Sequence, residues 1–127
     1  MFFQYKLGAT EKNVGPLEEW PFTNPASNYV IKEGSTPTAS GRIDQSGPTS
    51  RMGVWRCTKG TFECTEQGDE LMTVLSGKCQ IINHSENEVV YNLQAGDTLF
   101  IKGGSRVTWK ISEDVIKVFY GQKEDGY

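Results

Sequence analysis

The second half of the chain alternates between hydrophobic and polar positions in short runs. In residues 106–111 the odd-numbered side chains are Val, Trp and Ile, and the even-numbered ones are Arg, Thr and Lys. A period of two residues indicates a strand with one buried face. From Met52 onward there are eight β-prone runs separated by Gly, Asn or Asp: MGVWRC, TFECTE, ELMTVL, KCQIIN, EVVYNL, DTLFIK, RVTWKI and DVIKVFY. So many short strands predict an all-β sandwich or barrel.

Residues 1–50 have a different amino-acid composition. Gly, Pro, Asn and Ser follow one another too closely for a long helix, so we expect only short strands such as NYVIKEG. The segment around Trp20 and Phe22 is predicted to be an extended arm whose aromatic side chains are buried against the body of the protein. The length of 127 residues suits one domain. We therefore predict a single domain, with the arm and first strands in 1–50 and the barrel motifs in 52–120.

Two segments of the barrel region contain glycine residues at characteristic spacings, and the first also contains a glutamate. Glu70 and Gly77 frame one segment, and GDTLFIKGGSRV from Gly96 contains a second one that includes Gly104. These segments resemble the two motifs of the cupin superfamily, Gly-x5-His-x-His-x3/4-Glu-x6-Gly and Gly-x5-Pro-x-Gly-x2-His. The resemblance implies a cupin-type double-stranded β-helix, a jelly-roll barrel that encloses a ligand cavity, here with an extended N-terminal arm. The glycines would accept positive φ in tight turns between strands.

The resemblance extends to a narrower group. GVWRCTKGTF, DELMTVLSG, AGDTLFIKGG, VTWKI and IKVFY look like the small single-domain cupins grouped with the (S)-ureidoglycine aminohydrolase cupin domain. That activity is not expected to carry over, because one fold hosts many chemistries and the usual metal ligands do not match.

The first motif lacks its histidines. If three residues separate the His-x-His unit from Glu70, its two histidine positions fall on Cys64 and Glu66. If four residues separate them, the positions fall on Glu63 and Thr65. Strand phase favours the first alignment, because it places Phe62 and the thiol on the inner face.

The second motif lacks its metal ligand too. Its histidine position is Val107 and its proline position is Lys102. Cys64, Glu66 and Glu70 are chemically able ligands, but the set matches no familiar metal geometry. We therefore expect no metal and no cofactor.

Other candidate residues have simpler interpretations. Cys57, Cys64 and Cys79 are odd in number and form no C-x-x-C motif, so they are expected to be reduced, partly buried thiols. The one histidine, His84, lies in the polar hairpin loop NHSENE and is expected to face solvent. Asp97 is expected to stabilise a turn through nearby backbone groups.

The alternation predicts which side chains line the cavity. The predicted ligand-binding residues are Cys64, Glu66, Glu70, Met72, Val107, Trp109, Lys117 and Tyr120. About half of the inward residues could instead simply fill a closed barrel. Two carboxylates in one apolar site repel, so either Glu70 or Glu66 should have a raised pKa and is a candidate acid or base. Lys117 could point inward and neutralise one of them, or point outward.

Charge and hydropathy restrict the partners. A net charge of -3 and a pI near 5.2 provide no basic surface for nucleic acid. No apolar run of membrane-spanning length and no basic, apolar leader is present, so we expect no membrane association and a cytoplasmic location. Exposed strand edges suggest that a homodimer could form.

Two main functions follow. The first is a metal-free, small-molecule-binding cupin whose organic ligand the sequence does not name. The alternative is a hydrolase, isomerase or lyase that uses Glu70 or Glu66 as acid or base, with or without a non-standard metal site. A purely structural or partner-binding role is a third option.

Overall fold

The computed structural model describes all of residues 1–127, and its regular secondary structure is almost wholly β-strand. The strands are β1 (Glu18–Glu19), β2 (Val30–Ile31), β3 (Ala39–Ser46), β4 (Ser50–Cys57), β5 (Gly60–Thr65), β6 (Asp69–Asn83), β7 (Val89–Gln94), β8 (Thr98–Ile101) and β9 (Arg106–Gln122). The single helix is the 3-10 turn η1 (Pro25–Ser27). No helix is long and apolar enough to cross a membrane. The all-β prediction is confirmed.

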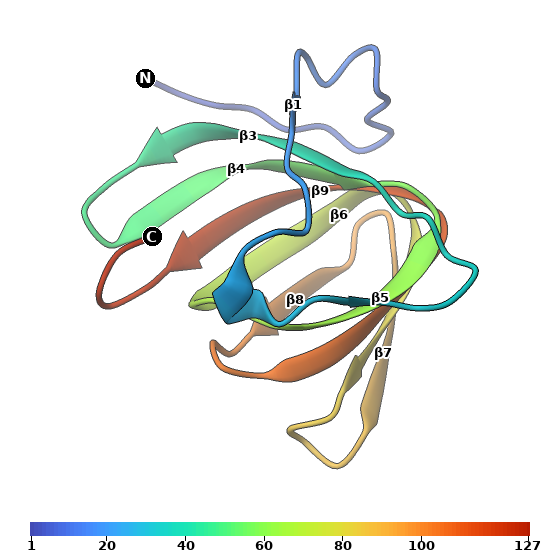
Figure 1. Ribbon diagram of the computed structural model, residues 1–127. Coiled ribbons are helices and arrows are strands. Elements are labelled where there is room, and N and C mark those ends of the chain that lie inside the picture. The colour runs from blue at the N-terminus through green and yellow to red at the C-terminus, as the bar shows by residue number, and fades with distance from the viewer.

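The strands form one curled antiparallel sheet around β9. One edge of β9 pairs with β6 from Val107 to Gln122. Its other edge pairs with β5 through residues 106–111 and with β4 through residues 115–122. Because β9 changes partner halfway along its length, the sheet curls over into the two facing layers of a jelly-roll barrel, as Figure 1 shows.

Four of the predicted runs merge into two long strands. ELMTVL and KCQIIN lie in β6, and RVTWKI and DVIKVFY lie in β9. Gly77 interrupts β6 as a β-bulge with φ of 87° rather than as a turn. A Cβ there would lie 2.1 Å from the carbonyl oxygen of Asp114, so only glycine fits. Gly96, with φ of 95°, does occupy the predicted turn between β7 and β8.

The N-terminal region contains one longer strand than the sequence predicts. The eight-residue strand β3 pairs with β4. Its sequence, ASGRIDQS, has few β-branched residues, so its strand structure depends on the neighbouring β4 rather than on intrinsic propensity.

The first seventeen residues cover the outer face of the sheet. Partly buried side chains of this segment pack against three buried residues, Val54, Leu75 and Ile116. The hydroxyl of Tyr5 also donates a 2.6 Å hydrogen bond to Asp44. This segment therefore protects an apolar outer surface that the barrel itself leaves uncovered.

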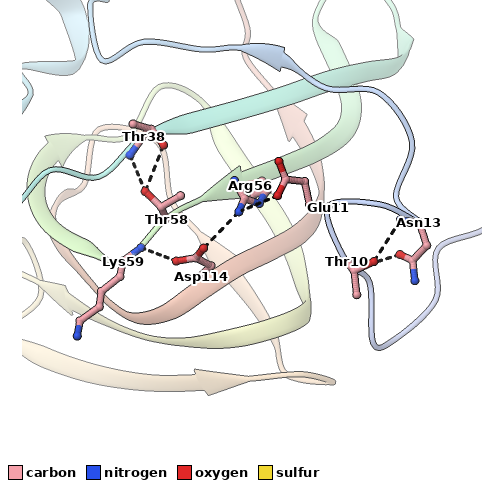
Figure 2. A network of polar contacts seen from close by, with 8 residues as sticks. All are labelled: Thr10, Glu11, Asn13, Thr38, Arg56, Thr58, Lys59 and Asp114. Atoms are coloured by element: carbon pink, nitrogen blue, oxygen red, sulfur yellow. Dashed lines mark hydrogen bonds and ion pairs between the residues drawn. The ribbon is translucent and has the colours of Figure 1, made fainter.

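A polar network fixes the same segment at its turn. Arg56 lies 3.6 Å from Glu11 and 3.2 Å from Asp114, and Asp114 also accepts a hydrogen bond from the backbone N–H of Lys59 (Figure 2). Asn13 and Thr10 close the turn, because the side-chain oxygen of each accepts a hydrogen bond from the backbone N–H of the other. The network joins the N-terminal segment to β4, to the turn that follows β4 and to the middle of β9.

The barrel interior holds the main hydrophobic core. Its buried side chains are Cys57, Phe62, Cys64, Met72, Val74, Cys79, Ile81, Leu93, Ile101, Val107, Trp109, Ile111, Val115 and Phe119. The three cysteines are separate free thiols. Trp20 and Phe22 pack against this core, as predicted for the arm, but they are only partly buried because they cover an open end of the barrel.

Candidate functional site

A cavity of about 440 Å³ lies between the barrel interior and the arm. The arm crosses from β3, where β1 pairs, to β5, where β2 pairs (Figure 1). Gln67 holds it in place by donating a 2.9 Å hydrogen bond to the carbonyl of Ala26 in η1. The aromatic wall consists of Trp20, Phe22, Tyr29, Trp55, Phe62, Trp109 and Phe119.

A second hollow, of about 460 Å³, lies beside β8. Its charged residues, Glu86 and Lys102, are both exposed. The aromatic-walled cavity instead brings charged side chains into the barrel interior, so it is the better candidate for a site of specific chemistry.

Lys117 and Glu70 form an ion pair at the cavity. The Lys117 Nζ atom lies 2.5 Å from Glu70 Oε2, and the lysine is only 5% exposed. The same ammonium lies 4.7 Å from the ring centroids of both Trp55 and Trp109. A carboxylate and two aromatic faces thus stabilise one buried cation.

Glu66 is the second carboxyl group of the cavity. It accepts a 2.9 Å hydrogen bond from the indole Nε1–H of Trp109, and the Cys64 thiol lies 3.7 Å from its Oε1. Burial raises the pKa of Glu66, and repulsion from Glu70 raises it further, while Lys117 acts in the opposite direction. Burial and the nearby Glu66 also raise the pKa of Cys64. The carboxyl of Glu66 is therefore the group best suited to hold and release a proton.

Replacing Glu66 by Gln should stabilise the protein at neutral pH. In the unfolded chain Glu66 has the ordinary glutamate pKa of about 4.3. In the folded protein its pKa is raised, so the proton is held to higher pH. The stability of the parent protein should therefore fall as the pH rises from about 4 through the raised native pKa. Urea unfolding at pH 4 and pH 8 should show a gain for Glu66→Gln only at pH 8.

The matched control is Glu113→Gln, because Glu113 is an exposed residue of β9. The stability of Glu113→Gln relative to the parent protein should not increase between pH 4 and pH 8. A Glu66→Gln protein with the same stability difference from the parent at both pH values would contradict the raised pKa.

The structure brings five of the predicted pocket residues together on the cavity wall. These are Cys64, Glu66, Glu70, Trp109 and Lys117. Of the two orientations considered for Lys117, the inward one is observed. Met72 and Val107 are each 2% exposed and lie in the barrel core without lining this cavity, and Val107 lines the second hollow instead.

The prediction for Tyr120 is wrong. Its side chain is 48% exposed on the outer face of β9, across from Leu71 of β6. Lys117 and Phe119 point into the barrel, and successive strand residues point to opposite faces. Tyr120 and Lys117 therefore cannot both face the cavity.

His84 is less exposed than predicted. Its Nε2 atom lies 2.6 Å from the hydroxyl oxygen of Thr108, and its Nδ1 atom lies 2.6 Å from Glu88. With 21% of its side chain exposed, it fastens the hairpin to β9. It is not part of the cavity wall. The prediction of a turn-stabilising role for Asp97 agrees with its hydrogen bond from the backbone N–H of Gln94.

Sequence reasoning missed much of the cavity wall. Arg51, Tyr29, Trp55 and Phe119 all line it. A signal existed for Phe119, which shares the inward phase of Lys117. None existed for Tyr29, whose position depends on the path of the arm.

The cavity does not fit the metal site that the cupin motifs imply. Val107 stands at one histidine position, and Glu70, the motif glutamate, is already paired with the Lys117 ammonium. A second cation beside that ammonium would be repelled, and the raised pKa of the Cys64 thiol disfavours the thiolate form that binds metal. No three His, Cys, Asp or Glu side chains gather as a metal-binding group.

Comparison with known proteins identifies the family. The sequence model of the EutQ-like cupin domain matches residues 45–119. No curated protein matches the sequence. The EutQ protein of Clostridium difficile is similar in structure, with a TM-score of 0.62 and 17% identity over 76% of this chain and 82% of that one.

Two further solved structures share the fold. A cupin-2 domain containing protein from Shewanella frigidimarina has a TM-score of 0.55 and 20% identity, over 66% of this chain and 80% of that one. A protein of unknown function from Pseudomonas syringae has a TM-score of 0.65 and 22% identity, over 84% of this chain and 44% of that one. At these identities the likeness shows a common fold alone.

Proposed function

Because the chain belongs to the EutQ-like cupin domain family, we propose that it uses its barrel cavity to bind a small organic ligand without a metal ion. The observation that carries the proposal is the aromatic-walled cavity with the Lys117–Glu70 ion pair and Glu66 on its wall. Apolar walls with a few converging polar groups are typical of sites for small organic molecules.

The polar groups favour a binding site over a structural interior. Placing Glu66 and Glu70 in one cavity costs desolvation and repulsion, and apolar side chains of similar size would fill the space without that cost. The raised pKa of Glu66 reflects this cost. An arrangement that is unfavourable for stability is expected where it serves recognition or chemistry.

Fragment soaking of crystals tests the proposal directly. Compounds of a general fragment library should occupy the space between Trp20 of the arm and Trp109 of β9 more often than any other surface hollow. If every fragment that binds lies outside this cavity, the proposed binding site is wrong.

Acid–base catalysis is the second candidate function, and the raised pKa of Glu66 favours it. As a hydrolase, isomerase or lyase, the protein would use the Glu66 carboxyl to donate or accept the proton that the reaction moves, while Lys117 and Glu70 would orient the substrate. For any substrate found, Glu66→Gln should then abolish turnover and leave binding almost unchanged. Equal losses of binding and turnover would favour the binding function alone.

We predict that purified protein carries far less than one equivalent of Mn, Fe, Ni or Zn. Elemental analysis together with native mass spectrometry on chelator-free protein measures this content and also detects an organic ligand that co-purifies. EDTA should leave the melting temperature unchanged. Stoichiometric metal that is lost together with stability would contradict the metal-free proposal.

Other parts of the proposal concern the oligomeric state, the cellular location and the partners of the protein. We propose a homodimer, which sedimentation velocity measures, a cytoplasmic location and no nucleic-acid partner. A closer kinship with the ureidoglycine aminohydrolase cupins also belongs to the proposal. Release of ammonia from (S)-ureidoglycine by the purified protein would support that kinship in function.

A further inference from the structure

Arg51 is a charged residue of the cavity wall that has no carboxylate partner. Two other arginines, Arg42 and Arg56, each form an ion pair with an aspartate. The Arg51 guanidinium instead lies beside aromatic rings, with its central carbon 3.9 Å from the ring centroid of Tyr127 and 6.0 Å from that of Phe119. Its charge therefore remains available to an anion that enters the cavity.

The other ionisable groups of the cavity wall are paired, favour the uncharged form or are screened by water. Lys117 is paired with Glu70 and covered by two indole rings. Burial and Glu70 favour the uncharged form of Glu66 by raising its pKa. Glu19 lies on the arm and is exposed, so water screens its charge. Arg51 is thus the unpaired cation of the wall.

The position of Arg51 suits a planar anion. The contact with the Tyr127 ring restrains the Arg51 side chain. The planar guanidinium presents several N–H donors along its edge. A carboxylate can accept two parallel hydrogen bonds from this edge. The neighbouring wall is formed by flat aromatic side chains, including Trp20, Phe22 and Trp109, which suit an apolar and planar body.

We propose that Arg51 binds the carboxylate of a small ligand whose flat, apolar body lies among the aromatic side chains of the cavity. This inference rests on the proposed binding function and specifies its ligand class. A carboxylate matches the single charge of Arg51 better than a phosphate monoester, which carries about -1.5 to -2 charges at neutral pH.

Three aromatic probes of similar size test the inference by isothermal titration calorimetry: benzoate, benzamide and phenyl phosphate. Benzoate should bind the parent protein at least roughly tenfold more tightly than benzamide, the range expected for a charge-assisted hydrogen bond. Arg51→Gln should weaken benzoate binding roughly tenfold to hundredfold while leaving benzamide binding nearly unchanged. Arg51→Lys keeps the charge without the planar fork and should give an intermediate loss.

Arg106→Gln is the matched control, because Arg106 is exposed and is not part of the cavity wall. It should bind benzoate like the parent protein. If Arg51→Gln does not fold, the Arg51→Lys comparison between benzoate and benzamide still decides the point. Crystals soaked with benzoate should place the carboxylate at the guanidinium edge.

The outcomes separate the ligand class from the binding function. If benzamide binds in the cavity as tightly as benzoate, or if Arg51→Gln leaves benzoate affinity unchanged, the role of Arg51 is wrong and the binding function stands. Tighter binding of phenyl phosphate than of benzoate would overturn the carboxylate assignment. If none of the three probes binds in the cavity, the inference is wrong, and fragment soaking then decides on the binding function separately.

Discussion

Replacing Lys117 by Met should lower the free energy of unfolding by about 3–5 kcal/mol, the range observed when one partner of a buried ion pair is removed. Methionine fills a similar volume but leaves the Glu70 carboxylate without its cation and next to Glu66. The two indole rings that flank the ammonium lose their charged partner as well. Equilibrium unfolding in urea measures the loss.

A double variant separates the ion pair from packing. Lys117→Met combined with Glu70→Gln removes both charges, so it should be clearly more stable than Lys117→Met alone. Glu70→Gln alone should be destabilising too, because it leaves the buried ammonium without its carboxylate. Sequence reasoning alone, which counts only the repulsion between Glu66 and Glu70, predicts little loss for this variant.

The control for this series is Lys102→Met. Lys102 pairs with Asp69 on the surface, where its side chain is 75% exposed, so its loss should cost at most about 1 kcal/mol. A Lys117→Met protein as stable as the Lys102→Met protein would show that the buried pair makes no net contribution.

Replacing Phe62 by Ala should also cost about 3–5 kcal/mol, the usual cost for a fully buried phenylalanine. Phe62 is 2% exposed and joins the barrel to the arm. Its ring centroid lies 4.7 Å from that of Phe22 and 6.1 Å from that of Tyr29, both in the arm, and 6.2 Å from that of Trp109 in the barrel. Chemical denaturation measures the loss of stability.

The same substitution should loosen the arm. Cleavage between residues 20 and 29 by a non-specific protease should become faster in Phe62→Ala, because the arm loses its main aromatic contact. Phe100→Ala provides the control, since Phe100 is 57% exposed and its loss should change stability by no more than about 0.5 kcal/mol. If both variants lose the same stability and resist protease equally, Phe62 does not hold the arm.

Local sequence pattern determined the fold class and much of the inner face. Alternation in residues 106–111 predicted that Val107, Trp109 and Ile111 point inward, and all three are buried. The phase of β5 likewise placed Phe62 and Cys64 inside, as observed. These inferences succeed because the direction of a side chain along a strand has a period of two, which can be read from the sequence within one strand.

Tertiary structure decided the remaining features. The merging of two runs into β6 depends on a bulge at Gly77, where the backbone of Asp114 in β9 approaches so closely that only glycine fits. The predicted inward position of Tyr120 was wrong because Tyr120 lies three residues after Lys117, on the opposite face of β9, and the tertiary structure decided that Lys117 is the inward residue. A glycine in a sequence does not reveal whether it turns the chain or bulges within a continuing strand.

Some chemical features of the cavity could be read from the sequence, and others depended on the tertiary structure. The sequence by itself identified Glu66 and Glu70 as carboxylates of one inner surface and showed that the usual histidines are absent. Only the tertiary structure decided that Lys117 neutralises Glu70, that Glu66 keeps a raised pKa, and that Arg51 remains without a carboxylate partner. Charge pairing depends on distances between residues far apart in the chain, such as positions 70 and 117, and no local pattern encodes those distances.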